Sequence, residues 1–135
     1  MEIMKNSLVD LEMVRANPQI RQYLGIGDQY LEVAGRIQHD EIHTNQVANK
    51  SRYILSQLGY PERETELAAI AGFLHDIGNL INRYNHGLTG AVLSFYLLSE
   101  MGMDPEELAV IISAIGNHEE NTGGYPVNHV AAAVI

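Results

Sequence analysis

The stretch ETELAAIAGFLHDIGN, residues 64–79, joins a helical pattern of apolar residues to a histidine and an aspartate. Four of its apolar residues repeat at the i, i+3, i+4, i+7 spacing of one buried helical stripe: Leu67, Ile70, Ala71 and Leu74. His75 and Asp76 follow directly. Imidazole nitrogen and carboxylate oxygen together suit a hydrolytic divalent metal rather than a structural zinc held by thiolates. The stretch therefore predicts a buried helix that ends in metal ligands.

Helix signals also dominate after this stretch. An apolar helix fits between Thr89 and Met101, and a further helix is predicted from Asp104 as N-cap and Pro105 as its first residue. The chain therefore continues as helices, with little sign of strands.

Before the central stretch, Asn17-Pro18 is predicted to begin a shorter helix, and residues 25–28 are predicted to form a turn. A long helix is expected from about residue 29 to 58, where residues 59–61, Gly-Tyr-Pro, would stop it. These patterns predict an all-α fold: residues 1–135 form one domain, a helical bundle of roughly six or seven helices.

Three more histidines, His43, His86 and His118, lie on or beside other predicted helices. A helical bundle can project side chains from several helices to one point in its interior. We therefore expect these histidines to join His75 and Asp76 at a single site.

Composition narrows the classes of partner. The 135 residues include no cysteine, which excludes disulfides, cysteine-bound zinc and a thiol nucleophile. A net charge of −9 with scattered basic residues argues against a nucleic acid polymer as partner, and an anionic substrate would need local cations such as a bound metal. No signal peptide or membrane span is evident, so we expect a cytoplasmic protein without a membrane partner. The sequence leaves homo-oligomerisation open.

Four segments, in order, resemble the HD-domain superfamily of metal-dependent phosphohydrolases. They are His43 followed by TNQVANKSRYIL, then FLHDIGN, then NHGLTGAVLS and then AIGNHEE, over about residues 43–118. A His-Asp dipeptide alone is weak evidence, but the ordered set is specific, with an apolar helix before His75 and Ile77-Gly78 after Asp76. The resemblance implies an HD-like helical fold.

The resemblance also implies a set of site residues. His43, His75 and Asp76 would bind one metal, with His75 and Asp76 as the catalytic pair. His86 and His118 match the order of the extra ligands in members with two metals, where Asp76 would bridge both ions. The cofactor would be one or two divalent ions of manganese, iron, magnesium, nickel or zinc.

Two departures from the family pattern stand out. Asn79 replaces the lysine that many relatives carry after His-Asp-x-Gly, although asparagine can still donate hydrogen bonds. The family's last metal ligand is an aspartate on a later helix, whereas no aspartate follows Asp104 and residues 130–135 are an apolar run. We therefore expect the chain to be cut short of that aspartate. Otherwise Glu119 or Glu120 could substitute, or the site would be weak.

Several polar residues near these segments are candidates for other roles. Asn79, Arg83 and Lys50 are predicted to bind substrate phosphate, although each basic side chain taken singly is better explained as a surface charge. His39-Asp40 is a second His-Asp dipeptide without the apolar helix before it, so we interpret it as solvated surface. His129 has no evident partner, which favours a structural role.

The leading functional hypothesis is therefore a hydrolase that uses metal-activated water on a small phosphorylated substrate, a nucleotide or a related phosphoester. An alternative is a degenerate HD domain that binds metal or nucleotide as a sensor or assembly module without turnover. A third is a metal-free helical interaction domain, in which the histidines would not converge.

Overall fold

The computed structural model describes residues 8–35, 41–119 and 128–135. Within these ranges the chain forms seven α-helices and one short 3-10 helix, with no strand. Their bounds are α2 (Leu11–Ala16), α3 (Pro18–Val33), α4 (Glu41–Gln57), α5 (Glu62–Leu74), η1 (Ile77–Leu80), α6 (His86–Glu100), α7 (Pro105–Gly116) and α8 (His129–Val134). The predicted all-α fold is confirmed, at the upper end of the expected number of helices.

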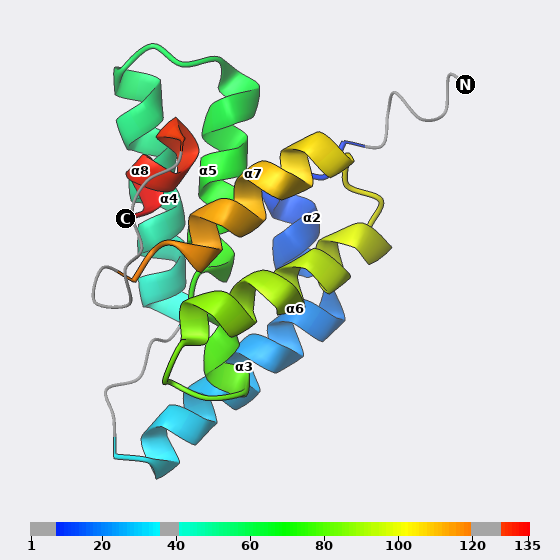
Figure 1. Cartoon of the computed structure of the whole chain (residues 1–135), viewed down its shortest axis with the longest axis vertical. Helices are drawn as coiled ribbons and strands as arrows, with labels where there is room; N and C mark the ends of the chain where they lie inside the picture. The colour runs from blue at the N-terminus through cyan, green and yellow to red at the C-terminus, as the bar shows by residue number, and fades with distance from the viewer. Residues whose placement is uncertain (1–7, 36–40, 120–127) are drawn as a thin grey trace.

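Helix α5 lies at the centre of the bundle, in contact with α2, α4, α7 and α8 (Figure 1). Every residue from Leu67 to Leu74 is buried, rather than the single stripe that the apolar spacing predicted. A helix with neighbours on all sides needs apolar or small residues all round. Gly72 meets this need where α4 crosses, since a Cβ there would lie 3.0 Å from the Val47 carbonyl oxygen.

Helices α6 and α7 form an antiparallel hairpin beside α5 (Figure 1). Asp104 caps α7 as predicted, because its carboxylate accepts from the backbone N–H groups of Glu106 at 3.1 Å and Glu107 at 3.2 Å. Gly102 makes the turn between the helices with φ +84°. The hairpin places the start of α6 and the end of α7 side by side.

Two predictions for the N-terminal half were wrong. Residues 25–28 lie inside α3 rather than in a turn. Gly27 serves close packing instead, because a Cβ there would lie 3.1 Å from the backbone nitrogen of Leu80 in η1. The helix expected from 29 to 58 is also interrupted, since α3 ends at Val33 and Gly35 follows with φ +73°. Tertiary packing on η1 thus outweighed the local turn signal.

The remaining boundaries agree better with expectation. The predicted stop after α4 is confirmed, with Gly59 at φ +83° before α5 begins. The apolar run 130–135 falls mostly in α8, which Asn128 caps by accepting from the backbone N–H of Ala131 at 2.7 Å. Helix α8 packs against α4, α5 and α7. Among the described residues, no helix has the length and apolar character needed to cross a bilayer.

Candidate metal centre

The ends of four helices meet at one point and bring the five predicted ligands together. His43 lies in the first turn of α4, and His75 and Asp76 lie between α5 and η1. His86 is the first residue of α6, and His118 follows α7 by two positions. The predicted convergence is therefore present, contrary to the expectation for a metal-free helical domain.

One half of the centre surrounds the Oδ2 atom of Asp76. This oxygen lies 3.3 Å from Nε2 of His43 and 3.0 Å from Nε2 of His75. The two Nε2 atoms are 3.3 Å apart. Three potential ligand atoms thus cluster within 4.8 Å of one another.

The other half surrounds Oδ1 of the same carboxylate. Nε2 of His86 lies 2.9 Å from Oδ1 and Nε2 of His118 lies 3.9 Å from it. These two Nε2 atoms are 3.0 Å apart. Each oxygen of Asp76 therefore faces its own pair of histidines, which is the arrangement of a bridging carboxylate.

Backbone carbonyl groups fix the orientation of three of the histidines. Each Nδ1 lies close to the carbonyl oxygen of the residue three positions earlier: His75 to Gly72 at 2.6 Å, His86 to Arg83 at 3.0 Å and His118 to Ile115 at 2.6 Å. A carbonyl only accepts, so each Nδ1 must donate and, in the neutral ring, each Nε2 keeps its lone pair. The lone pairs of His86 and His118 then face each other across 3.0 Å, an arrangement that a shared cation stabilises. The donor set fits a metal ion.

The pKa values of two of the histidines shift in opposite directions, although burial acts to lower both. It lowers the pKa of His118 to about 4, with further lowering by the nearby His75 and His86. For His75, burial also acts to lower the pKa, but the hydrogen bond and negative charge of Asp76 outweigh it and raise the value. His118 is therefore neutral at physiological pH, as a metal ligand must be.

A second carboxylate supports the centre from behind. Glu119 Oε2 lies 3.2 Å from Nδ1 of His86, and its Oε1 accepts from the backbone N–H of Gly87 at 2.9 Å. Glu119 thus contacts the outer nitrogen of a ligand histidine. Of two other acids close to the ligands in sequence, Glu41 is exposed, and Glu120 lies outside the described residues. Such outer contacts hold ligand rings in place.

Comparison with known proteins agrees with this geometry. The HD domain family matches residues 41–133, which is more than half of the chain and includes all five clustered residues. The chain belongs to the HD-domain family. HD domains bind divalent metals and form a family of metal-dependent hydrolases, and this His/Asp cluster could hold such an ion.

A solved structure supports the same assignment. This HD domain is similar to a predicted HD superfamily hydrolase from an uncultured Thermotogales bacterium, with a TM-score of 0.60 and 25% sequence identity. The similarity covers 91% of this chain and 70% of that one. No curated protein matches the chain.

The predicted substrate-binding residues of the HD domain differ in their distance from the centre. The Arg83 guanidinium lies 3.6 Å from Asp76 Oδ1 and donates to Asn79 Oδ1 at 3.3 Å, so both residues border the centre. Lys50 is exposed on α4, two turns beyond His43. Arg52, also on α4, is paired with Glu66 at 2.6 Å.

His129 does not join the centre. His129 contacts Glu64 and stacks on Tyr60, with ring centroids 4.3 Å apart, so it has a structural role as expected. Sequence reasoning missed both partners because they lie on or before α5, more than 60 residues away along the chain. His39-Asp40 lies outside the described residues.

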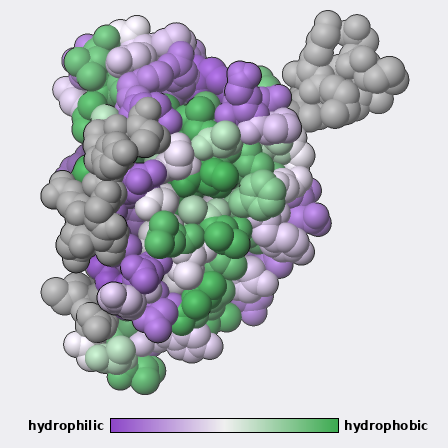
Figure 2. Space-filling model, viewed as in Figure 1, coloured by the Kyte–Doolittle hydropathy of each residue, from purple (hydrophilic) through white to green (hydrophobic). Residues whose placement is uncertain are grey.

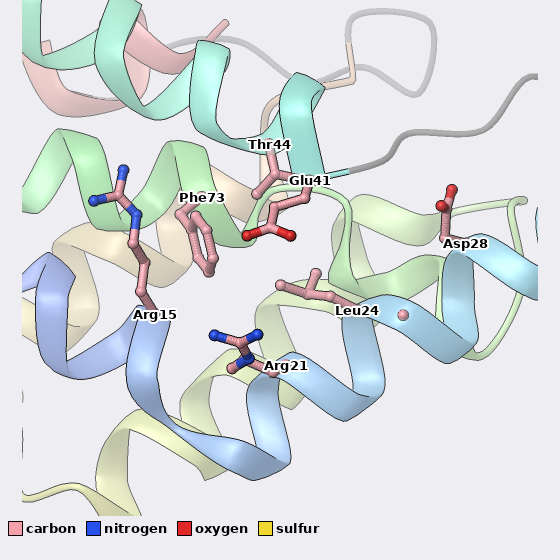
Figure 3. A pocket seen from close by; sticks show the side chains of 8 residues that line it. Arg15, Arg21, Leu24, Asp28, Glu41, Thr44 and Phe73 are labelled. Atoms are coloured by element: carbon pink, nitrogen blue, oxygen red, sulfur yellow. The ribbon is translucent and has the colours of Figure 1, made fainter.

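A cavity of about 310 Å³ lies on another flank of the HD domain (Figure 3). Its lining comes from α2, α3, α4 and α5: Arg15, Arg21, Leu24, Gly25, Asp28, Glu41, Thr44 and Phe73. Glu41 and His43 are two positions apart on α4, so they project about 200° apart around the helix. The cavity and the metal ligands therefore use different faces of α4.

Proposed function

We propose that this HD domain is a metal-dependent phosphohydrolase that acts on a small phosphorylated molecule, a nucleotide or a related phosphoester. The observation that carries the proposal is the carboxylate of Asp76, which presents one oxygen to each of two histidine pairs. His43 and His75 would hold one ion with Oδ2, and His86 and His118 would hold a second with Oδ1. A bound divalent ion lowers the pKa of coordinated water to about 7 and stabilises charge on a phosphoryl oxygen.

The protein itself supplies a rigid, buried frame for this chemistry. Asp76 is only 7% exposed, so its contacts are little screened by water. The backbone carbonyls at Gly72, Arg83 and Ile115 orient three imidazoles toward the carboxylate. These rings are therefore held in place before substrate binds, which reduces reorganisation during the reaction.

Arg83 is well placed to bind the phosphate group of the substrate. Its guanidinium reaches the edge of the centre and is held by Asn79, which occupies the position of the lysine found in many relatives. A planar guanidinium matches phosphate oxygens with paired hydrogen bonds. In a chain of net charge −9, this local cation would offset the repulsion of an anionic substrate. Lys50 remains a more distant candidate for the same role.

The metal assignment is tested by elemental analysis of protein purified without chelator. We expect about two equivalents of metal per chain, essentially all of it lost in Asp76→Ala, because that variant removes the carboxylate shared by both halves. His118→Ala should lose about one equivalent, since it removes a ligand from one half alone.

His129→Ala is the matched control, as a histidine outside the centre, and it should keep its metal. Retention of metal by Asp76→Ala would refute the assignment. One equivalent in the wild type, unaffected by His118→Ala, would limit the site to the first half. Full metal occupancy without turnover of any phosphoester would favour the degenerate binding module instead.

The role of Arg83 is tested by steady-state kinetics on a phosphoester that the wild type cleaves. Arg83→Gln should raise KM about tenfold or more, the cost of one hydrogen bond between charged groups, and leave the metal content unchanged. Arg21→Gln, which removes an arginine from the separate cavity, should leave the kinetics unaltered. Equal kinetics for Arg83→Gln and the wild type would remove Arg83 from the substrate site.

A further inference from the structure

The outer surface of α6 is an apolar face exposed to solvent. Four large side chains at helical spacing project from it: Leu88, 57% exposed, Val92, 70%, Phe95, 51%, and Tyr96, 54%. Figure 2 shows hydrophobic residues gathered over α6 and α7 on this side of the molecule. Monomeric proteins rarely expose apolar patches larger than roughly 300–600 Å², and patches of that size are often binding surfaces.

A groove runs along this face between α6 and α7. It encloses about 530 Å³ and is lined by apolar and small residues: Ala91, Val92, Phe95, Ala109, Ile112 and Ser113. Alanines and a serine leave the groove open, whereas Phe95 projects at its side. The face thus carries both a depression and a protruding aromatic ring. A complementary surface could fill the depression and receive the ring.

The charge distribution identifies this face as the one suited to a like-charged partner. Helix α6 has no Asp, Glu, Lys or Arg before Glu100, although the chain as a whole has a net charge of −9. Glu100 and Glu106 lie at the end of the hairpin away from His86, and Glu119 at the other end is turned toward His86 and Gly87, with its side chain 15% exposed. Two copies of the chain would repel each other through most surfaces, but not through this one.

We infer that the α6–α7 face, consisting of the four exposed α6 residues and the groove, binds a second copy of the chain in a symmetric dimer. In a two-fold pair with antiparallel α6 helices, Phe95 of each copy enters the groove of the other, and the acidic ends point apart. Each half-exposed aromatic side chain contributes on the order of 100 Å². With Leu88 and Val92, the four side chains supply about half of the roughly 800 Å² per partner of a stable interface, and the groove and its rim would add to this area.

This inference is independent of the proposed phosphohydrolase activity and is tested by the mass of the protein in solution. Light scattering and sedimentation equilibrium on the full chain should give twice the chain mass. Val92→Glu should give the mass of one chain, because it would bury a carboxylate in the centre of the dimer. The matched control Tyr53→Glu adds the same charge at an exposed aromatic residue of α4, 63% exposed, and should remain dimeric.

A second experiment locates the contact directly. Because the chain has no cysteine, a single introduced thiol reports on its own surroundings. Val92→Cys should form a disulfide-linked dimer on mild oxidation with diamide, whereas Ser56→Cys, at an exposed position on α4, should not. A monomeric wild type at high concentration would overturn the inference, as would a Val92→Glu variant that is folded by circular dichroism and still dimeric.

Discussion

Asp76 shows how a single residue can organise the centre of this HD domain. Its carboxylate is buried, and burial of a charge is costly unless the charge is compensated. The charge is compensated by hydrogen bonding to His75, whose pKa Asp76 raises, by Arg83 at 3.6 Å and, when bound, by metal. The same residue therefore lies at the junction between α5 and η1 and presents ligand atoms to both halves of the centre.

The lowered pKa of His118 predicts how the stability of the fold depends on pH. Its pKa is lowered from 6.5 to about 4 in the folded chain, so the unfolded chain binds more protons between these values. Burial of the neutral His118 ring therefore contributes fully to the free energy of unfolding above pH 6.5. This contribution is lost as pH falls toward 4. In chelator-treated protein, this loss should amount to at most about 3 kcal/mol.

The measurement is urea unfolding of wild type and His118→Asn, each at pH 7 and pH 5. The wild type should lose more free energy of unfolding than the variant over this interval, since asparagine does not titrate. Parallel losses in the two proteins would show that His118 titrates normally.

At the scale of elements, the centre depends on how closely η1 approaches α6. A Cβ at Gly78 would collide with the carbonyl oxygen of His86 and would lie 2.7 Å from the backbone nitrogen of Gly90. Because Gly78 is glycine, η1 can bring Asp76 to His86. This close approach is a constraint of packing, since the φ of Gly78 is not positive.

Gly78→Ala should accordingly separate η1 from α6. We expect a loss of about 1–3 kcal/mol in the free energy of unfolding, the usual cost of overpacking, together with reduced metal content. Gly25→Ala is the matched control, because its Cβ would meet nothing within 4 Å inside α3, and it should be neutral or stabilising by up to about 1 kcal/mol. Thermal unfolding and elemental analysis measure both effects, and equal behaviour of the two variants would contradict the packing argument.

At the scale of the whole molecule, a paired salt bridge links the central helix to the α6–α7 hairpin. Arg63 on α5 donates to both carboxylate oxygens of Glu107 on α7, at 2.8 and 2.7 Å. Both side chains are mostly buried, and the hydrogen bond to Glu107 raises the pKa of Arg63. The bridge therefore fixes the position of α7, whose end carries His118.

Glu107→Gln should cost about 1–3 kcal/mol in the free energy of unfolding, because it leaves the Arg63 charge without its carboxylate. Glu12→Gln breaks the pair between Arg15 and a glutamate whose side chain is 81% exposed, and should cost less than about 1 kcal/mol. Denaturant titration of the two variants compares them directly. A similar small loss in both would mean that the buried bridge contributes little.

The helical fold class, the ligand types and the family could be predicted from the sequence, because they depend on local spacing and on residue identity. The FLHDIGN stretch and the N-cap at Asp104 carry their signals within a few residues. The length of α3 was mispredicted, since the glycine at position 27 serves a contact with η1 rather than a turn.

Only the tertiary structure decided which histidines share which oxygen of Asp76, and that Glu119 rather than Glu41 supports His86. His43 and His75 lie 32 positions apart in the chain, as do His86 and His118. Their meeting depends on the crossing of α4 with α5 and of α6 with α7, which is set by the fit of side chains across each pair of helices. Spacing along the chain does not encode that fit. The family resemblance therefore implied the grouping of the ligands, but which oxygen of Asp76 each histidine pair faces could not be predicted from the sequence.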